Sequence, residues 1–355
     1  MFRSFGRLIA SAILLLLSVL MMAAAKYLPG LASIYRGFSR QILSGIAAFT
    51  GLFPFALWEV LLVILILLFL WSIIHMILQK RRFLNWISDV VLVVSILVFL
   101  FVGLWGLNHY CPDLSKEIGL DVREYTKDEL IAATKYYMDC ANQYAGSVER
   151  DENGNLVPQD FDVLAAIAGK SFEPLWQEYP ILQGSTAPIK KAALTWYPMS
   201  MMGYTGVFIT FTAESTVNPD TFTASLPHTM CHEAAHRNTI AAEDEANFAA
   251  FLACAASEDP NFLYSGYYSA FIYCYNALYK ADKNAAFALW NEESALLKLD
   301  CSGANTHYDQ YEGTVQDVAQ KVNDTYLKTF SEESGVQSYG EAADYLIAWY
   351  LQKTA

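Results

Sequence analysis

Three long apolar stretches dominate the first third of the chain, at about residues 8–28, 52–78 and 87–107. Each is long enough to cross a hydrocarbon core of about 30 Å as a helix. The first could instead be a signal peptide, with Arg3 and Arg7 as its charged start and small residues at 23–25 as a cleavage site. Because its apolar run is long, we expect this segment to be retained, so residues 1–107 are predicted to form a transmembrane region of three helices.

After residue 107 the pattern changes to the spacings of a water-soluble domain. Apolar residues at helical spacing predict helices at about 126–144, 161–167, 171–179 and 241–256, and an aromatic-rich helical stretch follows. Residues 205–212 alternate and are rich in β-branched and aromatic side chains, which predicts a strand. Residues 108–355 are therefore expected to form a mostly helical, α+β domain with a small β element.

Charge separates the two parts sharply. Residues 1–107 hold 8 of the 23 Lys and Arg residues and 2 of the 36 acids, whereas residues 108–355 hold the other 15 and 34. With the N-terminus in the cytoplasm, five basic residues would lie inside and three in the outer loop, which favours an extracytoplasmic acidic domain. A domain this acidic would be repelled by nucleic acid, so we expect the membrane and no nucleic acid among its partners.

Glu59 is the one acidic residue within the second apolar stretch. It lies near the expected membrane border, beside Trp58, and two interpretations are open. It is either an interfacial residue flanked by aromatic anchors or a polar contact with another span or with the soluble domain.

All six cysteines lie beyond residue 107. An even number in an outer domain permits disulfides, but no CxxC pair or dense framework is present. Free, partly buried thiols are therefore the simpler expectation, with disulfides as the alternative.

The strongest chemical signal is the HExxH sequence that runs from His232 to His236. Histidines four residues apart on a helix project from the same face and can bind one tetrahedral zinc ion. Glu233 follows the first histidine, where a carboxylate can take a proton from a metal-bound water and return it to a leaving group. The motif therefore predicts Zn²⁺ as the cofactor and Glu233 as the general base.

A catalytic zinc needs a third protein ligand, and Glu243 is predicted to supply it. Glu243 and Asn247 share a face of the next predicted helix, whereas Glu245 points about 200° away by the 3.6-residue period. Asn247 could orient His232 by accepting its spare ring N–H. Because the gap between His236 and Glu243 is short, Glu245 stays open as the alternative ligand.

Five other residues are candidates for supporting roles. His228 lies one turn before His232, but Pro227 puts it in the first turn of the helix, where a cap or cleft residue is expected rather than another ligand. Glu214 is a candidate cleft residue with no assigned role. An oxyanion over zinc is usually met by a second donor, often Tyr or His. The candidates for that donor are Tyr326, Tyr339 and His307.

The predicted strand at residues 205–212 comes shortly before the two histidines. In a peptidase, an open strand edge there can pair with an extended substrate backbone and hold the scissile carbonyl over the metal. A plain core hairpin explains the same pattern equally well, so both interpretations stay open.

Nearly the whole chain resembles a family of bacterial membrane proteins of unknown function. The resemblance rests on the three spans, residues 106–108 and 203–206, the block 226–247, and residues 322–328 with 335–340. It names no substrate. Locally, residues 243–247 are similar to the third-ligand segment of gluzincin-type zinc metallopeptidases, including integral-membrane peptidases whose segment ends in Asp rather than Asn247. That similarity implies Glu243 as the ligand.

Together these patterns predict a membrane-anchored zinc metallopeptidase with a zincin-like domain and an unidentified peptide or protein substrate. His232, His236 and Glu243 would bind the metal, with Glu233 as the base. The alternative is a non-enzymatic binding or sensor domain with a structural or vestigial zinc site, although a purely structural site has no use for Glu233. A third alternative is hydrolysis of a non-peptide amide of the cell envelope.

Overall fold

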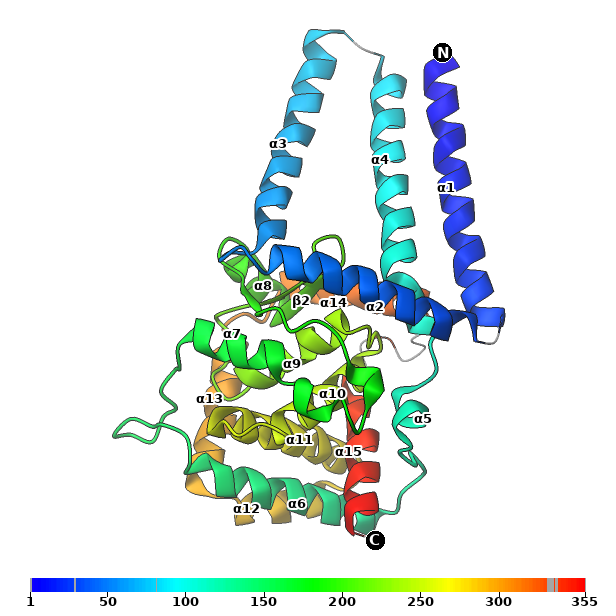
Figure 1. The fold of residues 1–355 in the computed structure, drawn as a ribbon. Helices are drawn as coiled ribbons and strands as arrows, with labels where there is room; N and C mark the ends of the chain where they lie inside the picture. Colours follow the sequence, from blue (N-terminus) through cyan, green and yellow to red (C-terminus); the bar gives the residue numbers. More distant parts are fainter. Residues whose placement is uncertain (1, 29, 81, 331–334, 336–337, 355) are drawn as a thin grey trace.

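The computed structural model describes residues 2–28, 30–80, 82–330, 335 and 338–354. Three long apolar helices, α1 (Phe2–Tyr27), α3 (Leu57–Leu78) and α4 (Phe83–Leu104), stand at one end, and the rest of the chain forms a body at the other (Figure 1). All three are long and apolar enough to cross a membrane. They match the predicted stretches, with α3 starting later because residues 51–55 form turns. The N-terminus and the α3–α4 turn lie at the end away from the body (Figure 1).

Helix α2 (Leu31–Thr50) is not a span but lies crosswise between the spans and the body (Figure 1). Its side chains on one face are buried: Ala32, Arg36, Ser39, Leu43, Ala47 and Thr50. The Arg40 guanidinium donates to the Ile181 carbonyl at 2.7 Å, and the Ser39 hydroxyl donates to the Leu104 carbonyl at 2.6 Å. The segment before residue 107 therefore contains a helix that packs on the body as well as three spans.

The body is mostly helical, as predicted. Its helices are α5 (Leu114–Ile118), α6 (Lys127–Ala145), α7 (Phe161–Lys170), α8 (Trp196–Met202), α9 (Leu226–Arg237), α10 (Glu243–Ala255), α11 (Pro260–Ala281), α12 (Lys283–Glu292), α13 (Ala295–Asp309), α14 (Thr314–Thr329) and α15 (Ser338–Thr354), with short 3-10 turns η1 (Gly106–Tyr110), η2 (Glu173–Leu175) and η3 (Pro180–Leu182). The helix predicted at 171–179 is wrong: only η2 forms there, and Pro180 disfavours a helical backbone at Tyr179, which has φ −126° and ψ 81°.

Helices α9 and α10 form the centre of the core and are almost entirely buried. Small residues let α11 approach closely: a Cβ on Gly266 would come within 2.6 Å of the Cys254 Cβ. The aromatic residues of α11 are largely core residues, with Phe262 and Phe271 fully buried. All six cysteines are free thiols, which was the simpler of the two expectations. The sulfur atoms of Cys231 and Cys254 lie 3.7 Å apart.

The small sheet has the order β1 (Lys190–Lys191), β3 (Glu214–Val217), β2 (Gly206–Ile209). Strand β3 pairs in parallel with β1 and antiparallel with β2. The strand predicted at 205–212 is shorter than expected because residues 210–213 turn into β3, with Ala213 at a φ of 49°. Among the described residues, β2 therefore has a partner on one side only.

Two buried carboxylates join α3 to the sheet. Glu214 accepts the main-chain N–H groups of Leu57 and Trp58 at 2.8 and 2.9 Å, which caps the start of α3. In return, Glu59 accepts the N–H groups of residues 193–195 at 2.8–3.1 Å. Of the two interpretations of Glu59, the structure shows the polar contact with the body.

Replacing Glu59 by Ala should destabilise the protein, because the amides of residues 193–195 would lose their acceptor. A hydrogen bond to a charged group contributes about 1.5–3 kcal/mol, so we expect a loss of about 2 kcal/mol. The thermal unfolding midpoint of the full chain in detergent measures this. Glu312→Ala, at an exposed position, is the control, and equal midpoints for the two variants would contradict the assigned role.

Candidate active site

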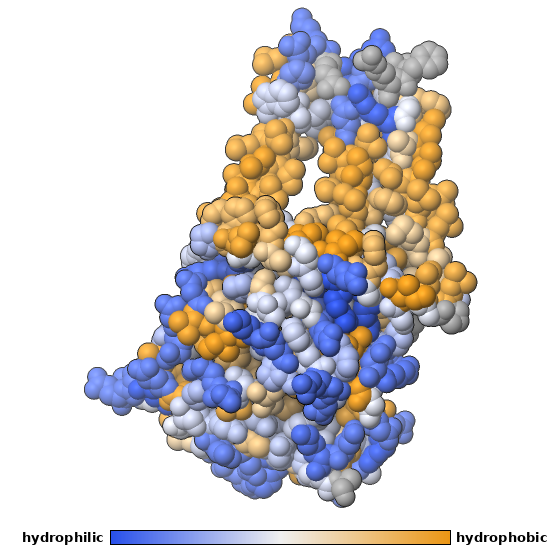
Figure 2. Space-filling view, viewed as in Figure 1, coloured by the Kyte–Doolittle hydropathy of each residue, from blue (hydrophilic) through white to orange (hydrophobic). Residues whose placement is uncertain are grey.

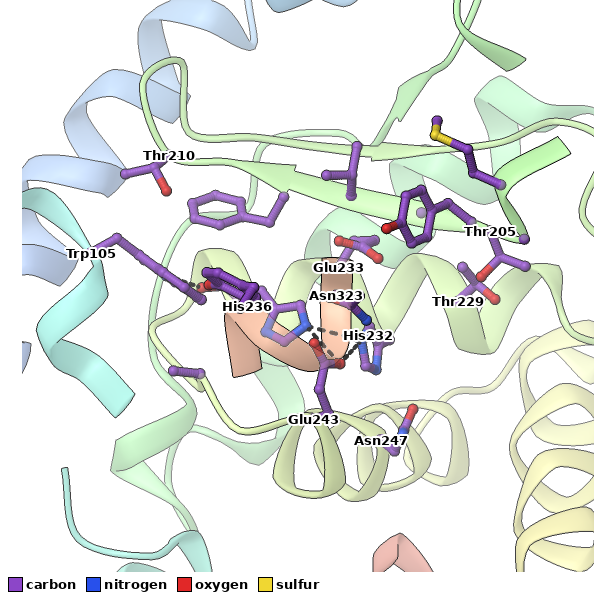
Figure 3. A pocket seen from close by; sticks show the side chains of 18 of the residues that line it. Trp105, Thr205, Thr210, Thr229, His232, Glu233, His236, Glu243, Asn247 and Asn323 are labelled. Atoms are coloured by element: carbon purple, nitrogen blue, oxygen red, sulfur yellow. Dashed lines mark hydrogen bonds and ion pairs between the residues drawn. The ribbon is translucent and has the colours of Figure 1, made fainter. Parts of the chain in front are cut away.

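The turn between α9 and α10 brings the two parts of the predicted site together. Helix α9 ends at Arg237, and α10 begins at Glu243. Thr239 adopts a φ of 74°, which reverses the chain within these few residues. The Asn238 side chain braces the turn by accepting the Ser185 N–H at 3.0 Å. As a result, the first residue of α10 faces the histidines of α9 (Figure 3).

His232, His236 and Glu243 form a compact cluster of potential metal ligands. The Nε2 atoms of the two histidines are 3.0 Å apart, and Glu243 Oε2 lies 3.2 and 3.4 Å from them (Figure 3). A tetrahedral zinc ion with bonds of about 2.1 Å holds its ligand atoms about 3.4 Å apart. The three donor atoms therefore match one face of a zinc coordination tetrahedron and leave its fourth corner open.

The charges in the cluster favour a cation. Burial alone would raise the pKa of Glu243, but His236 and His232 hold it well below its usual range. Burial lowers the pKa of His236, and Glu243 outweighs that effect and raises it to about 9. The carboxylate thus stays ionised beside the two rings, and its negative charge favours a divalent cation at this position.

Glu233 lies on α9 between the histidine cluster and β2 (Figure 3). Burial raises its pKa to about 7, and the nearby histidines oppose that rise. Its main-chain carbonyl accepts the Ser215 hydroxyl of β3 at 2.6 Å, which fixes α9 against the sheet. A Cβ on Gly206 of β2 would lie 2.7 Å from the Glu233 Cγ, so only glycine leaves room for this carboxyl group.

The cluster lies in a cavity of about 710 Å³. Its walls come from α9 and α10, from β2 and the residues before it, from the end of α4, and from α14. No site role was predicted for these lining residues: Trp105, His109, Tyr204, Thr205, Tyr273, Gln320 and Asn323. A tryptophan at the end of an apolar stretch, such as Trp105, by itself indicates only a residue at the membrane border. In the fold its indole donates to the His236 carbonyl at 3.1 Å.

The orienting role predicted for Asn247 is wrong. Asn247 lines the cavity, but its Oδ1 accepts the hydroxyl of Tyr273 at 3.0 Å instead of a ring N–H of His232. Tyr273 comes from α11, a helix whose position the local spacing did not reveal. His236 is the histidine with an oriented ring, because its Nδ1 lies 2.8 Å from the Ile240 carbonyl.

His228 lies in the first turn of α9, as predicted, and lines the cavity. Its Nε2 is 3.2 Å from the Asn247 carbonyl. Burial lowers the pKa of His228 to about 3, and His232 lowers it further, so the ring is neutral at pH 7. His228 is therefore a cleft residue beside the ligand cluster.

Three other candidate residues lie away from the His-His-Glu cluster. Glu245 faces away from the cluster and accepts the Leu114 N–H at 2.6 Å, so the geometry favours Glu243 as the third ligand. Glu214 is the cap of α3 and does not line the described cavity, which corrects its prediction as a cleft residue. His307 is also absent from that lining, and its Nε2 lies 2.6 Å from the Asp220 carbonyl, because this part of α13 packs against the loop after β3.

Of the two tyrosines predicted as a second donor, Tyr326 lines the cavity from α14. Its hydroxyl is 3.3 Å from Nε2 of His109, a residue that follows α4. The side chain of Tyr339 lies outside the part of the chain that the structure describes. Tyr326 and His109 therefore form a polar pair in the cavity wall.

Fold and site together define a protein with three candidate membrane-spanning helices and a helical body that holds a buried His-His-Glu cluster next to a glutamate. The chain belongs to the family described as protein of unknown function (DUF3810), which matches residues 34–347. This match confirms the predicted membership in a family of unknown function. No curated protein and no solved structure matches the chain.

Glu243→Gln should remove metal from the full-length protein, and Glu245→Gln should not. Both residues are buried in the first turn of α10, but only Glu243 offers an oxygen to the histidines. Loss of a direct ligand should exceed the roughly 10- to 100-fold cost in affinity that is typical for an outer-shell partner. Zinc per chain after dialysis is the measurement. Equal zinc content in the two variants would contradict Glu243 as the ligand.

Proposed function

We propose that this protein is a membrane-anchored zinc metallopeptidase that hydrolyses peptide bonds. The observation that carries the proposal is the triangle of His232, His236 and Glu243 donor atoms with Glu233 beside it, inside a cavity below a strand edge. A three-ligand set with an open fourth position is the arrangement of catalytic zinc sites. Glu233 also favours the enzyme over a binding domain with a structural site.

Each residue has a separate chemical role in this proposal. His232, His236 and Glu243 would hold Zn²⁺, which acidifies water and polarises a carbonyl when it is bound. Glu233 would take a proton from the attacking water and pass it to the leaving amine. Its burial supports this role, since a carboxylate whose pKa is raised to about 7 can both accept and release a proton near neutral pH.

The free edge of β2 would align the substrate. Hydrogen-bonded and non-hydrogen-bonded pairs alternate along an antiparallel ladder. The Thr205 carbonyl accepts the Asn218 N–H at 2.8 Å, so the next pair, Gly206 with Val217, does not exchange these bonds. By this alternation Gly206 and Phe208 turn their main-chain groups to the free edge. An extended peptide could add there as a further strand and cross the cavity above the cluster.

Tyr326 and His109 are the proposed donors to the oxyanion. They line the same cavity as the cluster, from α14 and from η1, and their polar atoms are 3.3 Å apart. A hydroxyl held by an imidazole is a suitable donor for negative charge that develops on a carbonyl oxygen. Their partnership links the C-terminal part of the chain to the site.

We place the catalytic body on the extracytoplasmic side. The N-terminus and the α3–α4 turn, which carry the larger group of basic residues, lie together at the far end of the spans (Figure 1). That arrangement supports an inner location for this end, because basic residues favour the cytoplasmic side.

A protease-sensitive tag added after residue 355 should be removed by protease applied outside intact cells. The same tag at the N-terminus should stay protected until the cells are lysed, and it serves as the control for integrity. The opposite pattern would contradict the proposed orientation, since an odd number of spans puts the two termini on opposite sides.

Glu233→Gln should abolish peptide cleavage by the full-length protein and leave its zinc content unchanged. The amide cannot accept a proton, and loss of a general base typically costs about 10²- to 10⁴-fold in rate. Cleavage of a fluorogenic peptide library and bound zinc are measured on the same samples. Zinc retained without cleavage by either protein would support a binding domain instead, and wild type without zinc would refute the proposal.

Gly206→Ala provides an independent check of the same carboxyl group. The added methyl group would displace the Glu233 side chain, so we expect a similar loss of cleavage with the zinc retained. Gly146→Ala is the matched control, because a Cβ at Gly146 meets no atom within 4 Å. Full activity of Gly206→Ala would show that Glu233 is not held where the structure puts it.

A further inference from the structure

The outer face of α2 carries exposed apolar side chains at the border between spans and body. Ile34, Phe38 and Phe49 fall on one side of this helix by the 3.6-residue period, and Ile34 is 76% exposed. The Tyr35 hydroxyl reaches the Val102 carbonyl of α4, so the neighbouring side of α2 faces the spans. Figure 2 shows the hydrophobic surface of the spans continuing onto this border, above a largely hydrophilic body.

Helix α8 extends the same apolar border on the other side of the spans. The segment just before α8, residues 193–195, donates main-chain N–H groups to Glu59. Because Glu59 is the third residue of α3, this segment lies at the start of a span. Three exposed apolar or aromatic side chains lie there: Leu194, Trp196 and Tyr197. Trp and Tyr are the residues most enriched at membrane–water interfaces.

Helix α14 runs along this border, because both of its ends contact elements that lie there. The Tyr326 ring is 6.2 Å from the ring of Phe101 in α4, and toward the other end a Cβ on Gly203, just after α8, would touch Gln316. Figure 1 shows α14 at the level of α2, below the spans.

The surface of α14 divides into three sides. Val315, Val318 and Val322 form an exposed stripe of one residue type at spacings of three and four. A second side, with Gln320, Asn323 and Tyr326, lines the cavity. The third side is charged and holds Asp317, Lys321, Asp324 and Lys328. A helix with separate apolar and charged sides is typical of one that lies in the membrane interface.

The cavity itself reaches the depth of the spans. Phe101 lines it, and this residue lies three positions before the end of α4 at Leu104. At 1.5 Å per residue, that position is about 4.5 Å inside the span. Part of the cavity wall is therefore one of the long apolar helices, and the part beside it is the helix with the exposed valines.

We propose that the exposed apolar side chains of α2, α8 and α14 lie in the bilayer surface, and that the cavity takes its substrate from there. The substrate would be a polypeptide segment held at the membrane by an apolar anchor, either a lipid chain or a transmembrane helix. This inference rests on the proposed peptidase function. It follows from the three spans, which fix the bilayer next to a site whose walls are α4 and α14. Anchoring in the same membrane raises the effective concentration of such a segment at the site.

The first experiment tests the contact with lipid and needs no activity. A solvatochromic amino acid is placed at position 318 of the full chain, reconstituted in phosphatidylcholine–phosphatidylglycerol vesicles. Val163 of α7 is the matched control, since Val318 and Val163 are 56% and 58% exposed. We expect a blue-shifted emission that brominated lipid quenches at position 318 only. Equal emission and quenching at the two positions would overturn the inference.

The second experiment tests the substrate class in the same vesicles. One fluorogenic peptide library is offered with an N-terminal acetyl group, with a palmitoyl chain, or fused to a transmembrane helix. Anchored peptides should be cleaved with a kcat/KM higher by about 10²-fold, the scale that an intramolecular encounter supplies. Val318→Asp combined with Val322→Asp should lose most of this advantage, and Val163→Asp should keep it. Faster cleavage with either anchor supports the inference and identifies the anchor.

The two failures are distinguishable. Equal kcat/KM for acetylated and anchored peptides would overturn the inference and leave the peptidase standing. Cleavage of no peptide by the zinc-loaded protein would overturn the proposed function, and with it the substrate class, whatever the emission at position 318 shows. An unchanged advantage in the double valine variant would also overturn the inference, because α14 would then have no part in access from the membrane.

Discussion

The reciprocal bonds of Glu59 and Glu214 determine where the site lies relative to the membrane. The first N–H groups of a helix have no partner within the helix and need one from elsewhere in the chain or from water. Glu214 supplies it to α3, and Glu59 supplies it to the segment that leads into α8. Both carboxylates are buried, so their charge-assisted bonds are strong and the two sides cannot shift independently. Strand β3 is thereby attached to α3. Strand β2, which lines the cavity, pairs with β3.

Helices α9 and α10, which carry the cluster, are held from the other side by α2 and by Trp105, the residue that follows α4. Trp105 donates to the carbonyl of His236, and Arg40 reaches the hydroxyl of Thr239 in the turn that leads to Glu243. A shift of either membrane-side element would thus move a ligand or the turn between ligands. The body is therefore built onto the spans, and the catalytic geometry that we propose depends on segments on both sides of residue 107.

Periodicity alone predicted much of the fold. The three spans follow from uninterrupted apolar length, and the helices around 126–144 and 241–256 follow from helical spacing. Helix α2 was not predicted, because Arg36, Ser39 and Arg40 interrupt its apolar residues. In the fold, polar groups of α2 bind distant partners, such as the carbonyls of Leu104 and Ile181. Residues 171–179 show the opposite failure: helical spacing was present, but Pro180 disfavours a helical backbone at the end of the segment, and only a short 3-10 turn forms.

The amino-acid sequence by itself determined which residues can form the cluster. The spacing of His232 and His236 follows from the helical period, which is a local property of the chain, whereas the turn between α9 and α10 decided for Glu243 over Glu245. What surrounds the cluster was decided by tertiary structure. Asn247 pairs with Tyr273 of α11, Gly206 of β2 makes room for Glu233, and Trp105, the residue that follows α4, donates to the His236 carbonyl. These partners lie from 26 to 131 residues apart, and no local spacing reveals which distant segments packing will bring together.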